Sequence, residues 1–227
     1  MFQVKQQDGN ARIGEMNLSG KIFETPIFMP VGTCGSVKGM FPWDLEADYP
    51  IILGNTFHLY LRPGDELIRD MGGLHKFESW KNSMLTDSGG YQAFSMSESK
   101  FVEDGVHFKS HLDGSKHFFS PTKSMEIQKN IGADIVMAFD QCLGFGASYE
   151  DTKKALLTTD RWLKECVEYP LASHQYLFGI VQGGFYEDLR KESLQRCLEY
   201  KLPGLALGGL AVGEPQDVLH HKLSTYL

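Results

Sequence analysis

The chain has 227 residues, of which 42% are hydrophobic and 22% are charged, and its formal net charge is −7. This composition is typical of a folded globular protein and excludes a disordered or fibrous one. No run of 18 apolar residues occurs, and segment 1–8 lacks the apolar core of a signal peptide, so we expect neither a membrane span nor secretion. The predicted location is cytoplasmic. The acidic charge alone argues against a nucleic-acid partner, because a phosphate backbone attracts basic surfaces.

The four cysteines, Cys34, Cys142, Cys166 and Cys197, lie far apart and form no Cys-x-x-Cys pair. This spacing argues against a local zinc knuckle and gives no disulfide framework. Buried, reduced thiols are the favoured interpretation.

Short apolar runs alternate with segments of helical period along most of the chain. Before the first run, an Asp-Gly turn at Asp8-Gly9 with strand-like flanks predicts an N-terminal antiparallel hairpin. Near-continuous apolar runs are typical of parallel strands buried on both faces. The strands predicted in this way are 26–31, 51–54, 84–87, 135–140, 177–182 and 204–208.

Between the third and fourth of these strands, Asp-Gly turns at 104–105 and 113–114 predict an inserted antiparallel hairpin. Ser120-Pro121 then indicates a helix start, and Ser148, three residues before Asp151, indicates another. A further amphipathic helix is predicted over 189–198, and a helical pattern begins at 218–223 without a terminal cap. Strand and helix alternation favours a doubly wound sheet or an eight-stranded barrel.

Polar residues and glycines follow the apolar runs at four places. They are Asp87, Asp140, Gln182 and the pair Gly208-Gly209. Each alone is more simply a turn or cap residue. Four such positions together favour a functional site, because the carboxyl ends of parallel barrel strands lie at one rim, where active sites form.

Such a pocket suits a purine of the guanine type. A carboxylate accepts hydrogen bonds from the ring N–H and the exocyclic amine at once, while a glutamine amide and a backbone N–H beside glycine suit the keto oxygen. Tyr91 could stack on the base, although core packing is about as reasonable for it. From residues alone, Asp87 and Asp140 could instead be the nucleophile and the acid/base of a sugar hydrolase.

Several strings resemble one family, in that family's order and over essentially the whole chain. They are GT at 32–33, GNTFHL at 54–59, GGLHKF at 72–77, LTDSGGYQ at 85–92, HLDGS at 111–115, MAFD at 137–140, VQGG at 181–184 and GGLAVGE at 208–214. The chain resembles the bacterial-type tRNA-guanine transglycosylases, also called queuine tRNA-ribosyltransferases.

The resemblance implies an α/β fold of the TIM (β/α)8 barrel family, with about six of the eight strands present and antiparallel hairpin insertions. It implies that residues 1–227 form a single, incomplete barrel domain that lacks the family's C-terminal zinc-binding part. It implies a glycosyltransferase that exchanges guanine at the wobble position of tRNA anticodons for 7-aminomethyl-7-deazaguanine in queuosine biosynthesis. The complete protein is expected to be a homodimer, to bind tRNA and guanine, and to contain zinc whose ligands this chain lacks.

The resemblance also implies residue roles. Asp87 is the general acid/base, and Asp140 recognises the ring N–H and amine edge of the base and does not attack the sugar. Gln182 and the Gly209 amide bind the keto side, and the Leu210 backbone meets the aminomethyl group. Cys142 either lines the pocket or is simply a small buried thiol. The remaining residues expected around the base are Ser88, Gly89, Gly90, Tyr91 and Gly208.

The chain departs from the family pattern in three ways. The family's nucleophilic aspartate would follow Glu214 in motif order, but no matching string occurs, so we expect the isolated chain to be inactive. Most of the basic tRNA contacts are also missing, which accounts for the acidic charge. In addition, Leu143-Gly144-Phe145-Gly146 replaces a proline-bearing loop. A non-catalytic subunit or deazaguanine-binding module of the same family, and an unrelated sugar hydrolase, remain as alternatives.

Overall fold

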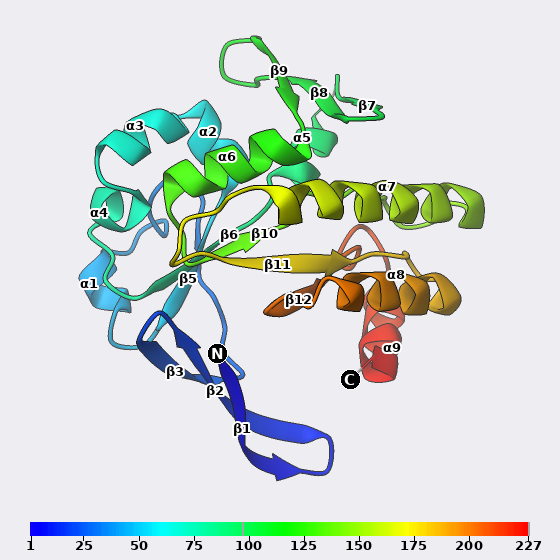
Figure 1. The fold of residues 1–227 in the computed structure, drawn as a ribbon, viewed down its shortest axis with the longest axis horizontal. Helices are drawn as coiled ribbons and strands as arrows, with labels where there is room; N and C mark the ends of the chain where they lie inside the picture. Colours follow the sequence, from blue (N-terminus) through cyan, green and yellow to red (C-terminus); the bar gives the residue numbers. More distant parts are fainter. Residues whose placement is uncertain (97, 227) are drawn as a thin grey trace.

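The computed structural model describes residues 1–96 and 98–226, and a parallel β-sheet forms its centre (Figure 1). Six strands of the described residues make this sheet, in the order β12-β11-β10-β6-β5-β4. The predicted count of parallel strands is therefore confirmed. Their bounds are β4 Val31–Gly32, β5 Ile51–Gly54, β6 Ser83–Thr86, β10 Ile135–Met137, β11 Tyr176–Val181 and β12 Gly204–Leu207.

The first predicted strand was wrong over most of its length. Segment 26–31 was predicted, but β4 contains only Val31 and Gly32. Pro26 and Pro30 have no backbone N–H to donate to a neighbouring strand, and this explains why a run of apolar residues here does not join the sheet. The strand predicted over 135–140 also ends early, at Met137.

The middle strands β5, β6 and β10 are buried on both faces, as the apolar runs predicted, whereas β11 alternates between buried and partly buried residues and β12 has no buried residue. Ile52, Met84 and Val136 belong to the larger core, on the face that the helices cover. Their chain neighbours on the strands point the other way, into a second cluster that includes Ile51, Leu85, Ile135 and Met137. Leu18 and Phe23 of the N-terminal antiparallel sheet complete that second cluster.

Two antiparallel sheets accompany the central one, and both hairpin predictions are confirmed. The N-terminal sheet packs against the second apolar cluster described above, and the inserted sheet follows α5 in the chain (Figure 1). The N-terminal sheet consists of β1 Phe2–Asp8, β2 Ala11–Leu18 and β3 Lys21–Thr25, and the inserted sheet of β7 Lys100–Val102, β8 Gly105–Lys109 and β9 Lys116–Phe119.

The two predicted helix starts are confirmed by their caps. The Ser120 hydroxyl accepts a hydrogen bond from the Lys123 N–H, and Ser148 does the same for Asp151. These bonds satisfy backbone donors that have no partner inside a helix. The helices are α1 Pro42–Leu45, α2 Thr56–Leu61, α3 Asp65–Asp70, α4 Leu74–Glu78, α5 Gly90–Ser95, α6 Pro121–Ile131, α7 Tyr149–Glu168, α8 Glu187–Glu199 and α9 Gln216–Tyr226.

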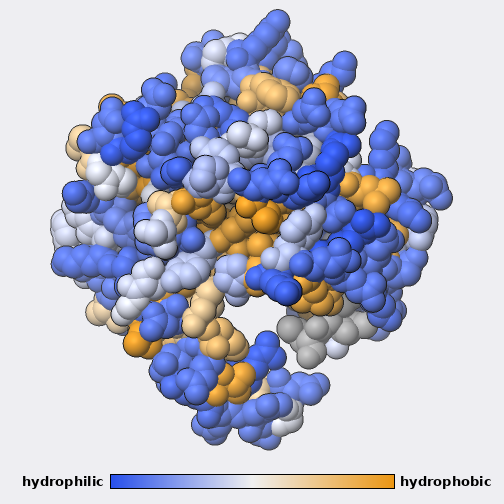
Figure 2. Space-filling model, viewed as in Figure 1, coloured by the Kyte–Doolittle hydropathy of each residue, from blue (hydrophilic) through white to orange (hydrophobic). Residues whose placement is uncertain are grey.

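The central sheet has β4 and β12 at its two edges within the described residues. Figure 2 shows apolar side chains in the middle of this view, above a hollow beside the β1–β2 hairpin. None of the helices in residues 1–96 and 98–226 has the length and apolar character needed to cross a membrane.

A polar network ties the N-terminal sheet to the N-terminal ends of the central strands. One carboxylate oxygen of Asp134 accepts hydrogen bonds from the Met84 N–H at 2.9 Å, from His75 Nε2 at 3.1 Å and from Lys21 Nζ at 3.3 Å. Burial alone would raise the pKa of Asp134, but the hydrogen bonds and the charges of His75 and Lys21 outweigh it and lower that pKa. The ionised carboxylate is therefore the form that the fold stabilises.

We expect Asp134→Asn to lower the free energy of unfolding by about 2 kcal/mol at neutral pH, because it removes charge-assisted hydrogen bonds. A carboxyl whose pKa is lowered by folding stabilises the protein above its unfolded pKa and loses that contribution as the pH falls. Urea unfolding across an acid pH series measures the difference from wild type. A difference that does not shrink at low pH would contradict the role given to the charge of Asp134.

Candidate functional site

The carboxyl ends of four central strands meet at a cavity of about 250 Å³. Asp87 follows β6 directly, Gln182 follows β11 and Gly208 follows β12, while Asp140 lies three residues beyond Met137, the last residue of β10. All of these residues line the cavity. The strand ends therefore bring together positions that the sequence separates by more than a hundred residues.

Asp87 is held by the start of α2. Its carboxylate accepts hydrogen bonds from the Asn55 side-chain amide and from the Thr56 N–H, each at 2.8 Å. The Thr56 hydroxyl donates to the Asp87 backbone carbonyl at 2.6 Å. Burial raises the pKa of Asp87 to about 6, while hydrogen bonds from Thr56, Gly89 and Gln92 oppose that rise. A carboxyl with this pKa exchanges a proton readily near neutral pH.

Asp140 also lines the cavity and is only 6% exposed. Its carboxylate accepts hydrogen bonds from the Ser88 hydroxyl at 3.2 Å and from the Gln182 side-chain amide at 2.6 Å. Burial raises its pKa, and these two hydrogen bonds oppose the rise. No ion pair with Asp140 occurs in the described part of the chain. The carboxylate is thus buried against neutral donors alone.

The loop after β12 forms the third wall. Gly208, Gly209 and Leu210 line the cavity, and Gly209 has φ +64°, a conformation that disfavours side chains. The Arg190 guanidinium, from α8, donates to the carbonyls of Val181, Gly184 and Gly209 and so joins this loop to the end of β11.

Cys142 and Tyr91 lie on the cavity wall in different states of exposure. Cys142 is 6% exposed, whereas Tyr91 is 45% exposed. Burial raises the pKa of the Cys142 thiol to about 12, and the Asp140 charge adds to the rise. The thiol is therefore neutral at physiological pH, which makes it a contact surface and a poor nucleophile.

The comparison with known proteins gives one family. The sequence model of the queuine tRNA-ribosyltransferase family matches residues 7–226. The chain belongs to this family. A queuine tRNA-ribosyltransferase of Dictyoglomus turgidum is 52% identical over 222 residues, which are 96% of this chain and 57% of that protein. Those of Nitratidesulfovibrio vulgaris and Bacillus cereus are each 51% identical, over 97% and 94% of this chain and 61% and 57% of their own lengths.

Most residues that the family resemblance singled out lie together, and their roles stay predictions. Gly89 and Gly90 do not line the cavity. Instead, Gly89 is the N-cap residue that precedes α5, with φ +75°, and the Gly90 N–H donates to the Ser88 hydroxyl at 3.2 Å. They shape the turn that presents Ser88 and Tyr91.

Sequence reasoning missed several residues of the site. No role was given to Asn55 or Thr56, although the string that contains them was noted, and Arg190 was not considered. A charged residue within the amphipathic pattern of 189–198 is the only signal that could have indicated Arg190. The other cavity-lining residues that were missed are Gln92, Met137, Ile180, Ala206 and Val212.

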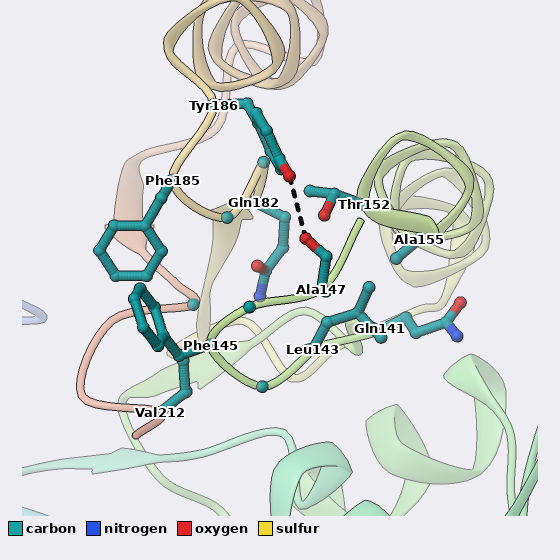
Figure 3. Close-up of a pocket in the computed structure, with 15 residues that line it drawn as sticks. Gln141, Leu143, Phe145, Ala147, Thr152, Ala155, Gln182, Phe185, Tyr186 and Val212 are labelled. Carbon is teal, nitrogen blue, oxygen red and sulfur yellow. Dashed lines mark hydrogen bonds between the residues drawn. The ribbon is translucent and has the colours of Figure 1, made fainter. Parts of the chain in front are cut away.

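A second cavity, of about 190 Å³, lies behind Gln182 and is lined by the loop that departs from the family pattern (Figure 3). The Phe145 N–H donates to the Val212 carbonyl at 3.2 Å, and the Phe145 ring meets Phe185 edge-on, with 5.1 Å between the centroids. Gly146 has φ +86°, which a proline cannot adopt. The loop therefore takes a shape for which glycine is needed.

The donor set for a structural zinc ion is not found among the described residues. Cys34 is exposed, whereas Cys142, Cys166 and Cys197 are buried. No group of three or more His, Cys, Asp or Glu side chains able to hold a metal occurs within residues 1–96 and 98–226. These residues do not fit zinc.

Thiol labelling tests the environment of Cys142. At about pH 7.5 we expect iodoacetamide to modify Cys34 readily and Cys142 far more slowly, because a thiol with a pKa near 12 contains almost no thiolate. Mass spectrometry of proteolytic fragments would locate the label. The Cys34→Ser variant is the control, because removal of the exposed thiol should remove the fast phase of labelling. Equal labelling of both residues would contradict the buried, neutral thiol.

Proposed function

We propose that this chain contains the base-binding site of a tRNA-guanine transglycosylase. The complete protein would exchange guanine at the anticodon wobble position of tRNA for 7-aminomethyl-7-deazaguanine, in queuosine biosynthesis. Family membership and the arrangement of Asp87, Asp140 and Gln182 around one cavity support this proposal. Because the chain spans 57–61% of the relatives named above, the activity, the substrates and the partners are proposed for a longer protein.

The observation that carries the proposal is the state of Asp140. Its carboxylate is almost fully buried and has neutral hydrogen-bond donors, and it forms no ion pair with any residue that the structure describes. Burying a carboxylate in this way costs free energy that a ligand with two adjacent N–H donors can recover. The ring N–H and exocyclic amine of guanine form such a pair, and 7-deazaguanines keep both groups.

The other cavity residues complete the recognition of the base. Gln182 has a side-chain amide that can donate to a keto oxygen, and the backbone near Gly209 approaches the cavity closely because no side chain intervenes. Tyr91 offers an exposed ring for stacking. Ser88, Cys142, Gly208 and Leu210 are proposed as contacts on the basis of their places on the cavity wall.

Asp87 is proposed as the general acid/base. With a pKa of about 6, its carboxyl can protonate a departing base and take a proton from an incoming one at near-neutral pH. The hydrogen bonds from Asn55 and Thr56 fix its orientation. The attack on the ribose is assigned to no residue of this chain.

The same proposal extends to the complete fold. A parallel sheet covered by helices on one face and apolar on the other is compatible with a (β/α)8 barrel, in which eight strands close around an apolar interior. Closure of the sheet, a zinc site, a homodimer and a cytoplasmic location are proposed for the whole protein.

Calorimetric titration with guanine tests the role of Asp140. We expect Asp140→Asn to weaken binding by about 3 kcal/mol, or roughly hundredfold, because the amide loses the charge and turns N–H groups toward the donors of the base. Asp217→Asn, on α9 and outside the cavity, is the matched control and should bind like wild type. Unchanged affinity in Asp140→Asn would refute the assignment.

A denaturing gel with labelled tRNA tests the proposed division of roles. We expect the isolated chain to form no covalent adduct, because Asp87 acts on protons and Asp140 holds the base. A stable adduct whose cross-linked peptide, located by mass spectrometry, contains Asp87 or Asp140 would identify that residue as a nucleophile and favour glycoside chemistry by this pair.

A further inference from the structure

Gln128 lies on α6, is fully buried and uses all of its hydrogen-bonding capacity. Its side-chain oxygen accepts hydrogen bonds from the Met137 N–H at 2.9 Å and from the Thr86 hydroxyl at 3.0 Å. Its side-chain nitrogen donates to the Met137 carbonyl at 2.9 Å and to the Ser124 hydroxyl at 3.1 Å. One amide group thus joins the last residue of β6 to the last residue of β10.

These contacts begin where the pairing of β6 with β10 stops. The two strands pair in register at Ile135 with Leu85 and at Val136 with Thr86, and no further pair follows. Met137 is the next residue of β10, and both its N–H and its carbonyl are satisfied by Gln128 instead of by β6. The glutamine amide therefore takes the place of the next peptide group in the ladder.

Beyond this point the two strands lead to Asp87 and Asp140, which both line the cavity. Asp87 follows Thr86 directly, and Asp140 lies three residues after Met137. The Ser124 hydroxyl extends the same network by donating to the Ser88 carbonyl at 2.7 Å. Gln128 and Ser124, one turn apart on α6, thus contact the backbone or side chains at both strand ends that bear the two carboxylates.

We propose that Gln128 is a positioning residue that fixes the separation of Asp87 and Asp140 and so sets the width of the slot for the base. The identity of the occupant, a guanine-type base, rests on the proposed function, whereas the spacing of the carboxylates does not. A ladder continued by backbone pairing would hold β6 and β10 together, and a purely apolar side chain would leave the Met137 N–H and carbonyl without partners. A glutamine amide has two N–H groups to donate and an oxygen that can accept two hydrogen bonds. It can therefore satisfy both the N–H and the carbonyl of Met137 and still bond to Thr86 and Ser124.

An amide also suits this position better than a carboxylate. A glutamate at position 128 would face the Met137 carbonyl with a second oxygen in place of the amide N–H. That contact would be repulsive, so hydrogen-bond chemistry as well as shape favours glutamine here.

Gln175 provides a matched control. It is also a buried glutamine, and its side-chain amide donates to the carbonyls of Gln128 and Ala133, each at 3.0 Å, while its oxygen accepts from the Ala172 N–H at 3.2 Å. It lies before β11, at the end of the sheet opposite to the cavity. Its loss should cost stability without moving the carboxylates.

The test compares Gln128→Met with Gln175→Met. Carboxyl-carbon NMR during a pH titration follows Asp87 and Asp140, and calorimetry follows guanine binding. We expect both variants to melt at lower temperature. Only Gln128→Met should move the midpoint of Asp87 downward from about 6, by roughly half a unit or more, since water enters a wider slot. Only Gln128→Met should weaken guanine binding, by about tenfold.

The outcomes separate this proposal from the proposed function. Titration midpoints that are the same in wild type, Gln128→Met and Gln175→Met would overturn the positioning role, whatever guanine does. Failure of the wild-type chain to bind guanine would refute the proposed function, while a shift confined to Gln128→Met would still support positioning. If Gln128→Met does not fold, Thr86→Val removes one of the four hydrogen bonds at nearly constant shape. It should shift Asp87 in the same direction, and an unchanged midpoint would overturn the proposal.

Discussion

The structure depends on two carboxyl groups, the buried Asp140 and the partly buried Asp87, that form no ion pair in the described part of the chain. Asp87 and Asp140 stand at the ends of neighbouring strands, and both pKa values are raised by burial. Such groups are costly, because a buried ionised carboxylate loses its hydration. The protein offsets the cost with neutral donors: Asn55 and Thr56 on one side, and Ser88 and Gln182 on the other. These donors fix the orientation of both carboxyl groups, and neither group forms an ion pair within the described residues.

The opposite end of the same strands shows what a purely structural carboxylate looks like. Asp134, at the start of β10, is buried too, but it contacts Lys21 and His75, and its pKa is lowered. These two partners come from β3 and α4, and the contact ties the N-terminal sheet to the central one. Two aspartates six residues apart, Asp134 and Asp140, therefore have opposite electrostatic surroundings. This contrast separates a stabilising carboxylate at one end of the sheet from the proposed binding site at the other.

Features that depend on local sequence could be predicted, and features that depend on distant contacts could not. The caps at Ser120 and Ser148 follow from residue types three positions apart, and the buried strands follow from apolar runs. Asp87 and Asp140 were found because a polar residue at the end of such a run is conspicuous. Arg190 and Gln128 were not, because their importance arises from backbone groups on other strands, and an amphipathic helix pattern does not distinguish a buried amide from a solvated one. The first strand was mispredicted because hydrophobicity was weighed without the missing N–H groups of Pro26 and Pro30.

The hydrogen bond between Gln182 and Asp140 raises a question about how a base could enter. At 2.6 Å the amide of Gln182 is already committed to the carboxylate, yet the same amide is proposed to meet the keto oxygen of the base. The two contacts are compatible, because a primary amide nitrogen carries two hydrogens. One can remain on Asp140 while the other points toward the keto oxygen, and the carboxylate oxygens keep lone pairs for the ring N–H and the amine. Under the proposed function, the bond would orient the glutamine before the base arrives and so lower the conformational cost of recognition.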